Sequence, residues 1–143
     1  MRLFKTLSIG SLVLATSLTA SAATAEVVAV VSARSSVTAL SEREIADIFL
    51  GRQSRFPNGE PAVPIDQIED APVRDEFYAK YANKSAAQVK AHWSKIIFTG
   101  RGQPPQAVAN GAEVKKRVAQ NPNAIGYIDD SLVDDSVRVL RKK

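Results

Sequence analysis

The side chains that most often carry out covalent chemistry are scarce in this 143-residue chain. It contains a single histidine, His92, and no cysteine, which excludes thiol catalysis and cysteine-ligated metal. It has no G-x-S-x-G motif, no P-loop and no Ser-His-Asp arrangement. Since a protein nucleophile needs a neighbouring base, and since a lone histidine is a poor metal site, we expect no enzymatic activity and no bound metal or cofactor.

Five polar residues are candidates for binding a small ligand. Arg74 stands one turn into an expected helix and could reach a ligand at the helix start, or could pair with Glu69, Asp70 or another acid. The loop after the first expected strand is predicted to face the strand ends where α/β sheets bind ligands, or to be a solvated turn; it holds Ser35 and Ser36. Arg101, in a Gly-rich loop, could meet an anion or point into water. Asp66 ends the second expected strand, where it could contact a ligand or cap a local amide.

The N-terminal segment has the pattern of a secretory signal peptide. Arg2 and Lys5 precede an apolar run, roughly residues 7–18, and the segment ends in Ala23-Thr24-Ala25. A charged start, a short apolar region and an A-x-A site are typical of a cleaved signal peptide, with cleavage expected after Ala25. We therefore expect an exported, periplasmic protein, and a single domain over residues 26–143.

The charge pattern argues against a nucleic-acid partner. Without Arg2 and Lys5 the formal net charge falls from +4 to +2, and the remaining basic residues alternate with acids along most expected helices. A nucleic-acid-binding protein concentrates its basic residues on one face.

Several segments carry clear secondary-structure signals. Residues 26–32, EVVAVVS, form a β-branched run typical of a strand buried on both faces. In residues 40–51, LSEREIADIFLG, Ser41 and Glu44 form a capping box, an apolar stripe follows, and Gly51 supplies the stop. A strand is expected over 62–66, followed by helices over 69–82 (capped by Asp70), 85–98 and 110–120. Residues 100–105 should be a loop, residues 124–128 a strand, 129–135 a turn or short helix, and 137–140 a last strand.

This alternation of strands and helices predicts an α/β fold. We expect a three-layer sandwich in which a mixed, mainly parallel sheet is covered by helices on both faces.

The order of these elements, together with several motifs, resembles one lobe of the phosphate-type periplasmic binding proteins. The motifs are LSEREIADIFLG at 40–51, the strand at 63–65, Trp93, the Gly-rich loop at 100–102 and NPNAIGY at 121–127. The resemblance implies one lobe of a type II periplasmic binding protein. It also implies transport of phosphate or a related oxyanion by an ABC system.

The resemblance also locates a binding site that this chain has altered. In two-lobed members, an Arg and a Gly-Ser-Gly-Thr turn bind phosphate at a helix start. Here Gln67 takes the place of the Arg, and Ala71, Pro72 and Val73 take the places of Ser, Gly and Thr. Both hydroxyls are lost, and proline has no amide to donate. We expect a degraded phosphate site.

Three hypotheses for function are compatible with the sequence. The first is a solute-binding-like domain that binds an oxyanion such as phosphate and serves an ABC permease, a sensor or a porin. The second is a periplasmic protein–protein interaction module that keeps the fold without binding a small ligand. The third is a homodimer that rebuilds a two-lobed trap across the exposed cleft face.

Overall fold

The computed structural model describes residues 26–143, so the expected signal peptide at 1–25 lies outside the described residues. Five strands form one open sheet in the order β3-β2-β4-β1-β5. Their bounds are β1 Val27–Ser32, β2 Val63–Gln67, β3 Gln106–Val108, β4 Ala124–Asp129 and β5 Val137–Val139. β2 is parallel to β3 and β4, whereas β1 is antiparallel to β4 and β5. Four strands therefore run in one direction and β1 opposes them, which confirms a mixed, mainly parallel sheet.

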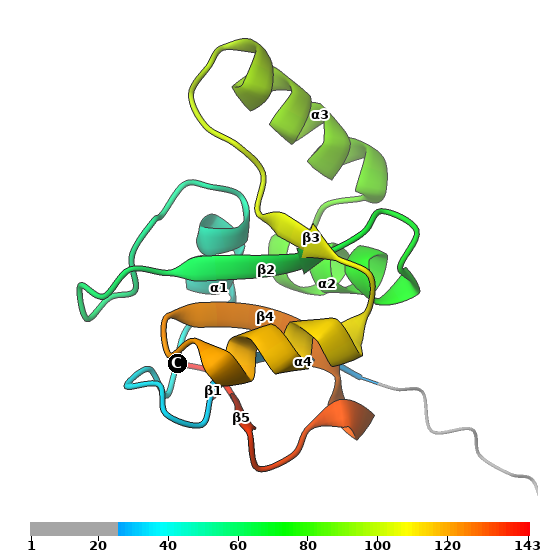
Figure 1. The fold of residues 1–143 in the computed structure, drawn as a ribbon. Coiled ribbons are helices and arrows are strands. Elements are labelled where there is room, and N and C mark those ends of the chain that lie inside the picture. The colour runs from blue at the N-terminus through cyan, green and yellow to red at the C-terminus, as the bar shows by residue number, and fades with distance from the viewer. Residues whose placement is uncertain (1–25) are drawn as a thin grey trace, which may run out of the picture.

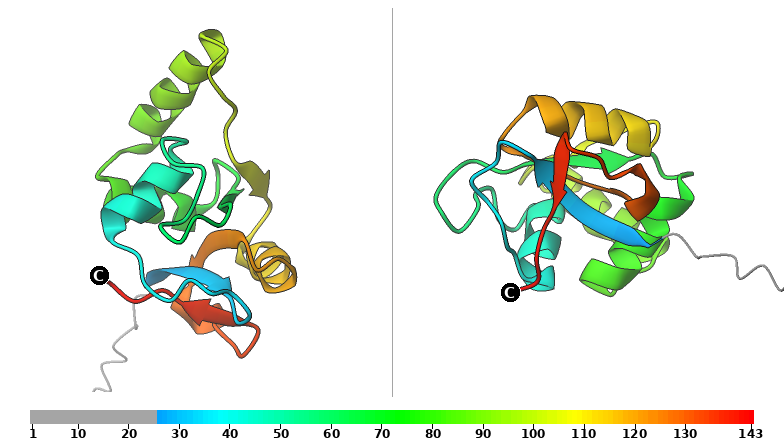
Figure 2. Two further views of the ribbon diagram at one scale, coloured as in Figure 1. Left: turned by 90° about the vertical axis from the view of Figure 1, so that its left-hand side faces the viewer. Right: turned by 90° about the horizontal axis from the view of Figure 1, so that it is seen from below.

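Helices cover both faces of the sheet, as expected for an α/β sandwich (Figure 1). Helices α1 (Glu42–Phe49) and α2 (Pro72–Ala82) lie on one face, and α4 (Gly111–Gln120) lies on the other. Helix α3 (Ala86–Phe98) follows α2 and projects beyond the sheet, as the two views in Figure 2 also show. A short 3-10 helix, Asp130–Leu132, links β4 to β5. Among residues 26–143, no helix is long and apolar enough to span a bilayer.

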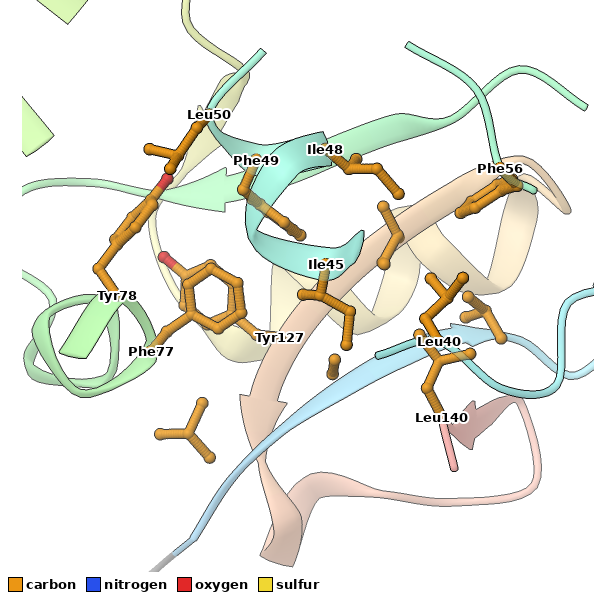
Figure 3. Packing of buried hydrophobic residues seen from close by; sticks show 14 of the residues in the cluster. Leu40, Ile45, Ile48, Phe49, Leu50, Phe56, Phe77, Tyr78, Tyr127 and Leu140 are labelled. Carbon is orange, nitrogen blue, oxygen red and sulfur yellow. The ribbon is translucent and has the colours of Figure 1, made fainter. Parts of the chain in front are cut away.

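The larger hydrophobic core lies between the sheet and helices α1 and α2 (Figure 3), and α3 contributes Val89 and Trp93 to it. Its centre is aromatic: the rings of Phe77 and Tyr127 stack with centroids 3.9 Å apart, and Phe49 meets Phe77 edge-on at 4.7 Å. Such aromatic pairs add about 0.5–1.5 kcal/mol each beyond the burial of their surface. This stacking fixes α2 against β4, and α2 begins at the candidate site.

Local sequence signals set the helix ends at most positions. The capping box is present at α1, where the Ser41 hydroxyl accepts from the Glu44 amide at 3.1 Å. A second one opens α3, between Ser85 and Gln88. Gly51 follows α1 with φ +72°, a conformation that glycine adopts without steric cost.

Two expectations about local structure are wrong. Helix α2 begins at Pro72, not at 69, and its N-cap is Ala71, so Asp70 does not cap it. Proline fits the first helical position and holds the preceding residue extended, which places the helix start three residues later. In addition, β3 is not predicted from the sequence; it is a three-residue strand that pairs with β2.

Candidate functional site

The strongest concentration of predicted site residues lies where β2 ends and α2 begins. Five of the eight candidates belong to this one connection: Asp66, Gln67, Ala71, Val73 and Arg74. Asp66 and Gln67 are the last two residues of β2, and the turn after them leads directly into α2. The local order of the chain therefore brings these five together.

Asp66 is a buried carboxylate, with only 3% of its surface exposed. Tyr78 donates its hydroxyl hydrogen to Oδ2 at 2.6 Å, and the Tyr127 hydroxyl donates to Oδ1. The backbone amide of Gln67 also donates to Oδ1, at 2.8 Å. A buried charge is tolerated only when it is paired and hydrogen-bonded, and these donors meet that need. Capping of a local amide, one of the two roles expected for Asp66, is therefore present.

Arg74 supplies the positive charge that balances this carboxylate. Its Nε lies 3.6 Å from Asp66 Oδ1, and both side chains are nearly buried. Its guanidinium carbon also lies 5.1 Å from the centre of the Tyr78 ring, a cation–π distance. Arg74 thus pairs with an acid, and the acid is Asp66, not Glu69 or Asp70.

The two tyrosines that bind Asp66 are held in their neutral form. Burial, followed by the charge of the Asp66 carboxylate, raises the pKa of the Tyr78 hydroxyl far above its usual value of 10. The same two causes raise the pKa of the Tyr127 hydroxyl. A phenolate beside a buried carboxylate would place two negative charges in contact, so both tyrosines act as hydrogen-bond donors.

Gln67 is engaged inside the protein. It is 2% exposed, and its side-chain Nε2 donates to the Tyr127 carbonyl oxygen at 3.0 Å. Its amide also lies 3.2 Å from the Tyr127 hydroxyl oxygen. Gln67, the residue expected in the place of the family's Arg, therefore links β2 to β4 by a side-chain hydrogen bond.

The start of α2 offers few donors for an anion. Ala71 makes no side-chain cap, Pro72 has no amide hydrogen, and the Arg74 amide bonds the Ala71 carbonyl at 3.0 Å. The half-buried Val73 adds only an apolar side chain. Both acids in the preceding turn, at 69 and 70, are exposed and add negative charge beside this helix start.

The expectation that Ser35 and Ser36 face the strand ends where a ligand would bind, as Asp66 does, is wrong. β1 is antiparallel to β4, and β4 is parallel to β2. The carboxyl end of β1 therefore lies on the same side of the sheet as the start of β2, opposite the end of β2 that holds Asp66. Near the carboxyl end of β1, the Ser35 hydroxyl accepts from the Val37 amide at 3.1 Å, while Ser36 accepts from Asn58 at 3.0 Å. These two serines are separated from the β2–α2 connection by the length of the sheet.

Arg101 is also placed away from the other candidates. It is exposed in the loop that follows the outer end of α3, where its amide bonds the Ile96 carbonyl at 3.1 Å. Figures 1 and 2 show this loop at the far end of the projecting helix, beyond the sheet.

A separate hollow of about 840 Å³ lies beside α1. It is formed by that helix, the end of α2 and the C-terminal residues, and none of the predicted site residues lines it. Its charges are largely paired, for example Lys142 with Glu42 at 2.7 Å and Arg52 with Asp47 at 3.6 Å.

Comparison with solved structures identifies the architecture. A protein described as a phosphate ABC transporter substrate-binding protein from Clostridium perfringens, solved with bound phosphate, matches with a TM-score of 0.67 at 23% identity. The match covers 82% of this chain and 45% of that one. This chain has the fold of one lobe of a phosphate-type substrate-binding protein.

Two further solved proteins give the same result. An ABC-type phosphate transport receptor from Vibrio cholerae matches with a TM-score of 0.64 at 17% identity, over 82% of this chain and 46% of that one. PstS from Borrelia burgdorferi matches with a TM-score of 0.63 at 14% identity, over 83% of this chain and 47% of that one. This chain spans less than half the length of these relatives. No family model matches it, and no curated protein matches it.

Tyr78 and Tyr127, which complete the site by binding Asp66, are not among the residues predicted from the sequence. Tyr78 lies four residues after Arg74, so the two share one helix face, which is a signal that could have been used. Tyr127 lies in the AIGYI strand, and only the pairing of β4 beside β2 brings it to Asp66.

Proposed function

We propose that this chain is an exported solute-binding-like domain, related in fold to oxyanion-binding proteins of ABC transporters, whose phosphate site is degraded. One observation carries the proposal: at the place where the resemblance puts phosphate, the guanidinium of Arg74 is paired with the buried carboxylate of Asp66. An anion at this helix start would compete with a covalently attached carboxylate for the same positive charge.

The expected consequence is weak phosphate binding, in the millimolar range or weaker. In this proposal the domain works in the periplasm, after export by the N-terminal segment, in uptake or sensing together with a permease, a sensor or a porin. It has no catalytic role and needs no cofactor.

Isothermal titration calorimetry with phosphate and sulfate tests the proposal. The parent chain should give no heat at micromolar ligand. A repaired variant, Ala71→Ser/Pro72→Gly/Val73→Thr, restores two hydroxyls and one amide at the start of α2. It should bind phosphate at least about tenfold more tightly, since each charge-assisted hydrogen bond contributes about 1.5–3 kcal/mol.

The chain offers a matched control at another helix start. The variant Ala86→Gly/Ala87→Thr places the same Ser-Gly-Thr sequence, beginning at Ser85, at the start of α3. This variant should bind phosphate no better than the parent. Micromolar affinity in the parent would contradict a degraded site, while equal affinities in the two variants would contradict the location.

A second candidate function is an interaction module that docks an envelope partner through the same edge of the sheet. Its support is Ile68, which is 44% exposed in the turn between β2 and α2, where a ligand-binding lobe would present polar donors. Cross-linking from position 68 in envelope extract should then yield a discrete partner that the Ile68→Ser variant loses. A dimer mass in sedimentation that is lost in the same variant would instead indicate pairing of two copies.

A further inference from the structure

The outer end of α3 exposes the two least covered large apolar residues among residues 26–143. Phe98 has 93% of its surface exposed and Ile97 has 55%. Contiguous exposed apolar surface marks sites of protein or membrane contact, whereas a single exposed apolar residue is ordinary; here two adjacent large side chains are exposed together. Figures 1 and 2 show that this end of α3 points away from the sheet and the other helices.

Two residues nearer the start of α3 attach the helix to the larger core. Val89 is fully buried and Trp93 is 6% exposed, both in the larger core. The Trp93 ring lies so close to Gly51 that an added Cβ there would approach it to 2.7 Å. Helix α3 is thus anchored through Val89 and Trp93, and its last turn extends beyond them.

All of the charge on this projection is positive. Residues 82–112 contain Lys84, Lys90, Lys95 and Arg101 and no acidic residue. None of these four is in an ion pair within the part of the chain that the structure describes. By contrast, Lys115 of α4 pairs with Asp134 at 2.8 Å. The projection is therefore complementary to an anionic surface.

The backbone at the helix end is already hydrogen-bonded. The Thr99 hydroxyl donates to the carbonyls of Lys95 and Ile96 at 3.0 and 3.1 Å. The amides of Gly100 and Arg101 donate to Ile97 and Ile96, both at 3.1 Å. Unsatisfied backbone groups are strongly disfavoured in an apolar medium, and at this helix end three carbonyls are satisfied internally.

We propose that the end of α3 docks onto the surface of an anionic phospholipid bilayer. Ile97 and Phe98 enter the boundary between headgroups and acyl chains, while Lys90, Lys95 and Arg101 lie near the lipid phosphates. Apolar side chains flanked by basic residues are typical of reversible interfacial binding, and each basic residue strengthens attraction to anionic lipid. A bilayer accepts a convex end without a matching groove, whereas a protein partner would need a pocket for Phe98.

Vesicle co-sedimentation tests this proposal directly. The full chain should bind vesicles of phosphatidylcholine that contain about 30% phosphatidylglycerol, and it should bind vesicles of pure phosphatidylcholine much more weakly. The affinity for the anionic vesicles should fall as the salt concentration is raised. Phe98→Ser should weaken binding about tenfold, because the aromatic ring no longer leaves water. Lys90→Glu/Lys95→Glu should weaken it by about 25-fold or more, at about fivefold for each charge. All variants keep residues 1–25 as the parent has them, so any contribution of that segment is constant.

Matched controls separate this surface from general charge effects. Lys116→Glu changes an exposed basic residue on α4, on the other side of the sheet, and should reduce binding less than twofold. Because Phe98 is almost fully exposed, its replacement should leave the thermal unfolding midpoint unchanged, which shows that lost binding is not lost folding.

The absence of cysteine allows a second, position-specific measurement. A Phe98→Cys variant labelled with an environment-sensitive dye should show a blue-shifted, brighter emission on anionic vesicles. A Glu113→Cys variant labelled in the same way should not. No binding of the parent to anionic vesicles at low salt would overturn the proposal, as would binding that the α3 variants leave intact. Phe98-dependent dimerisation, or Phe98-dependent capture of an acidic protein without vesicle binding, would overturn it as well.

Discussion

Arg74 and Asp66 form a buried ion pair at the start of α2, with Nε 3.6 Å from Oδ1. Removal of one partner from such a pair leaves an unpaired charge in the interior, which typically costs about 3–5 kcal/mol. Asp66→Asn should therefore lower the free energy of unfolding in urea by roughly that amount. Asp66→Asn/Arg74→Met, which removes both charges, should recover at least half of the loss.

A surface pair provides the comparison for this ion pair. Asp47 lies 3.6 Å from Arg52, and both side chains are substantially exposed. Asp47→Asn should cost less than about 1 kcal/mol. If the single Asp66 variant were equally mild, the pair could not be what holds Arg74 away from a ligand.

The neutral tyrosines predict a loss of stability in alkali. The folded protein raises the pKa of Tyr78 and Tyr127 above 10. The contribution of the two neutral tyrosines to the free energy of unfolding is therefore fully present below pH 10 and is lost as pH rises above it. Unfolding then releases a proton from each tyrosine, which lowers the free energy of unfolding by about 1.4 kcal/mol per tyrosine for each pH unit. Urea unfolding between pH 9 and 11 measures this slope.

A single substitution assigns the slope to this site. Tyr127→Phe lowers the stability at every pH, but it should also make the decline above pH 10 shallower by about 1.4 kcal/mol per unit. An unchanged slope in that variant would mean that other groups titrate on unfolding. Absorbance at 295 nm should show that both hydroxyls ionise only when the protein unfolds.

The sequence predicts the local features of this fold well. The capping box of Ser41 and Glu44 is formed by residues three apart, and the left-handed turn at Gly51 needs only one residue. Neither feature depends on the rest of the chain. Local sequence signals also predict a strand followed by a helix at the β2–α2 connection, which is one continuous segment.

Features that depend on strand pairing could not be predicted in the same way. The direction of β1 decides where Ser35 lies, and a β-branched run has no signal for direction. Likewise, Tyr127 reaches Asp66 across 61 positions of sequence through the pairing of β4 with β2. The resemblance places an altered anion site at the start of α2, but it does not indicate that Arg74 pairs there with Asp66.

The contact between Gly51 and Trp93 predicts a graded response to alanine. At Gly51, φ is +72°, and an added Cβ would lie 2.7 Å from the Trp93 ring. At Gly100, φ is +67°, with nothing within 4 Å. Gly100→Ala should cost about 1 kcal/mol from the backbone alone, and Gly51→Ala at least about 1–3 kcal/mol more from the clash. Urea unfolding gives both values, and fluorescence of the single tryptophan should shift only in the Gly51 variant.

Gly126 of β4 allows α4 to pack closely on the sheet, so a larger residue at this position should destabilise the fold. An added Cβ at Gly126 would lie 2.4 Å from Val114 Cγ1 and 3.0 Å from Val118 Cγ2, both on fully buried side chains. Because neither valine can move outward without shifting α4, Gly126→Ala should lower the free energy of unfolding by about 1–3 kcal/mol or more. Val114→Ala alone removes buried methyl groups and should also destabilise, by about 1–3 kcal/mol.

The double variant is the decisive measurement for this contact. In Gly126→Ala/Val114→Ala, the methyl group added to β4 enters the space vacated on α4. The double variant should therefore be more stable than the sum of the two single losses predicts, by at least about 1 kcal/mol. Strict additivity in urea unfolding would show that the two residues do not compete for the same space.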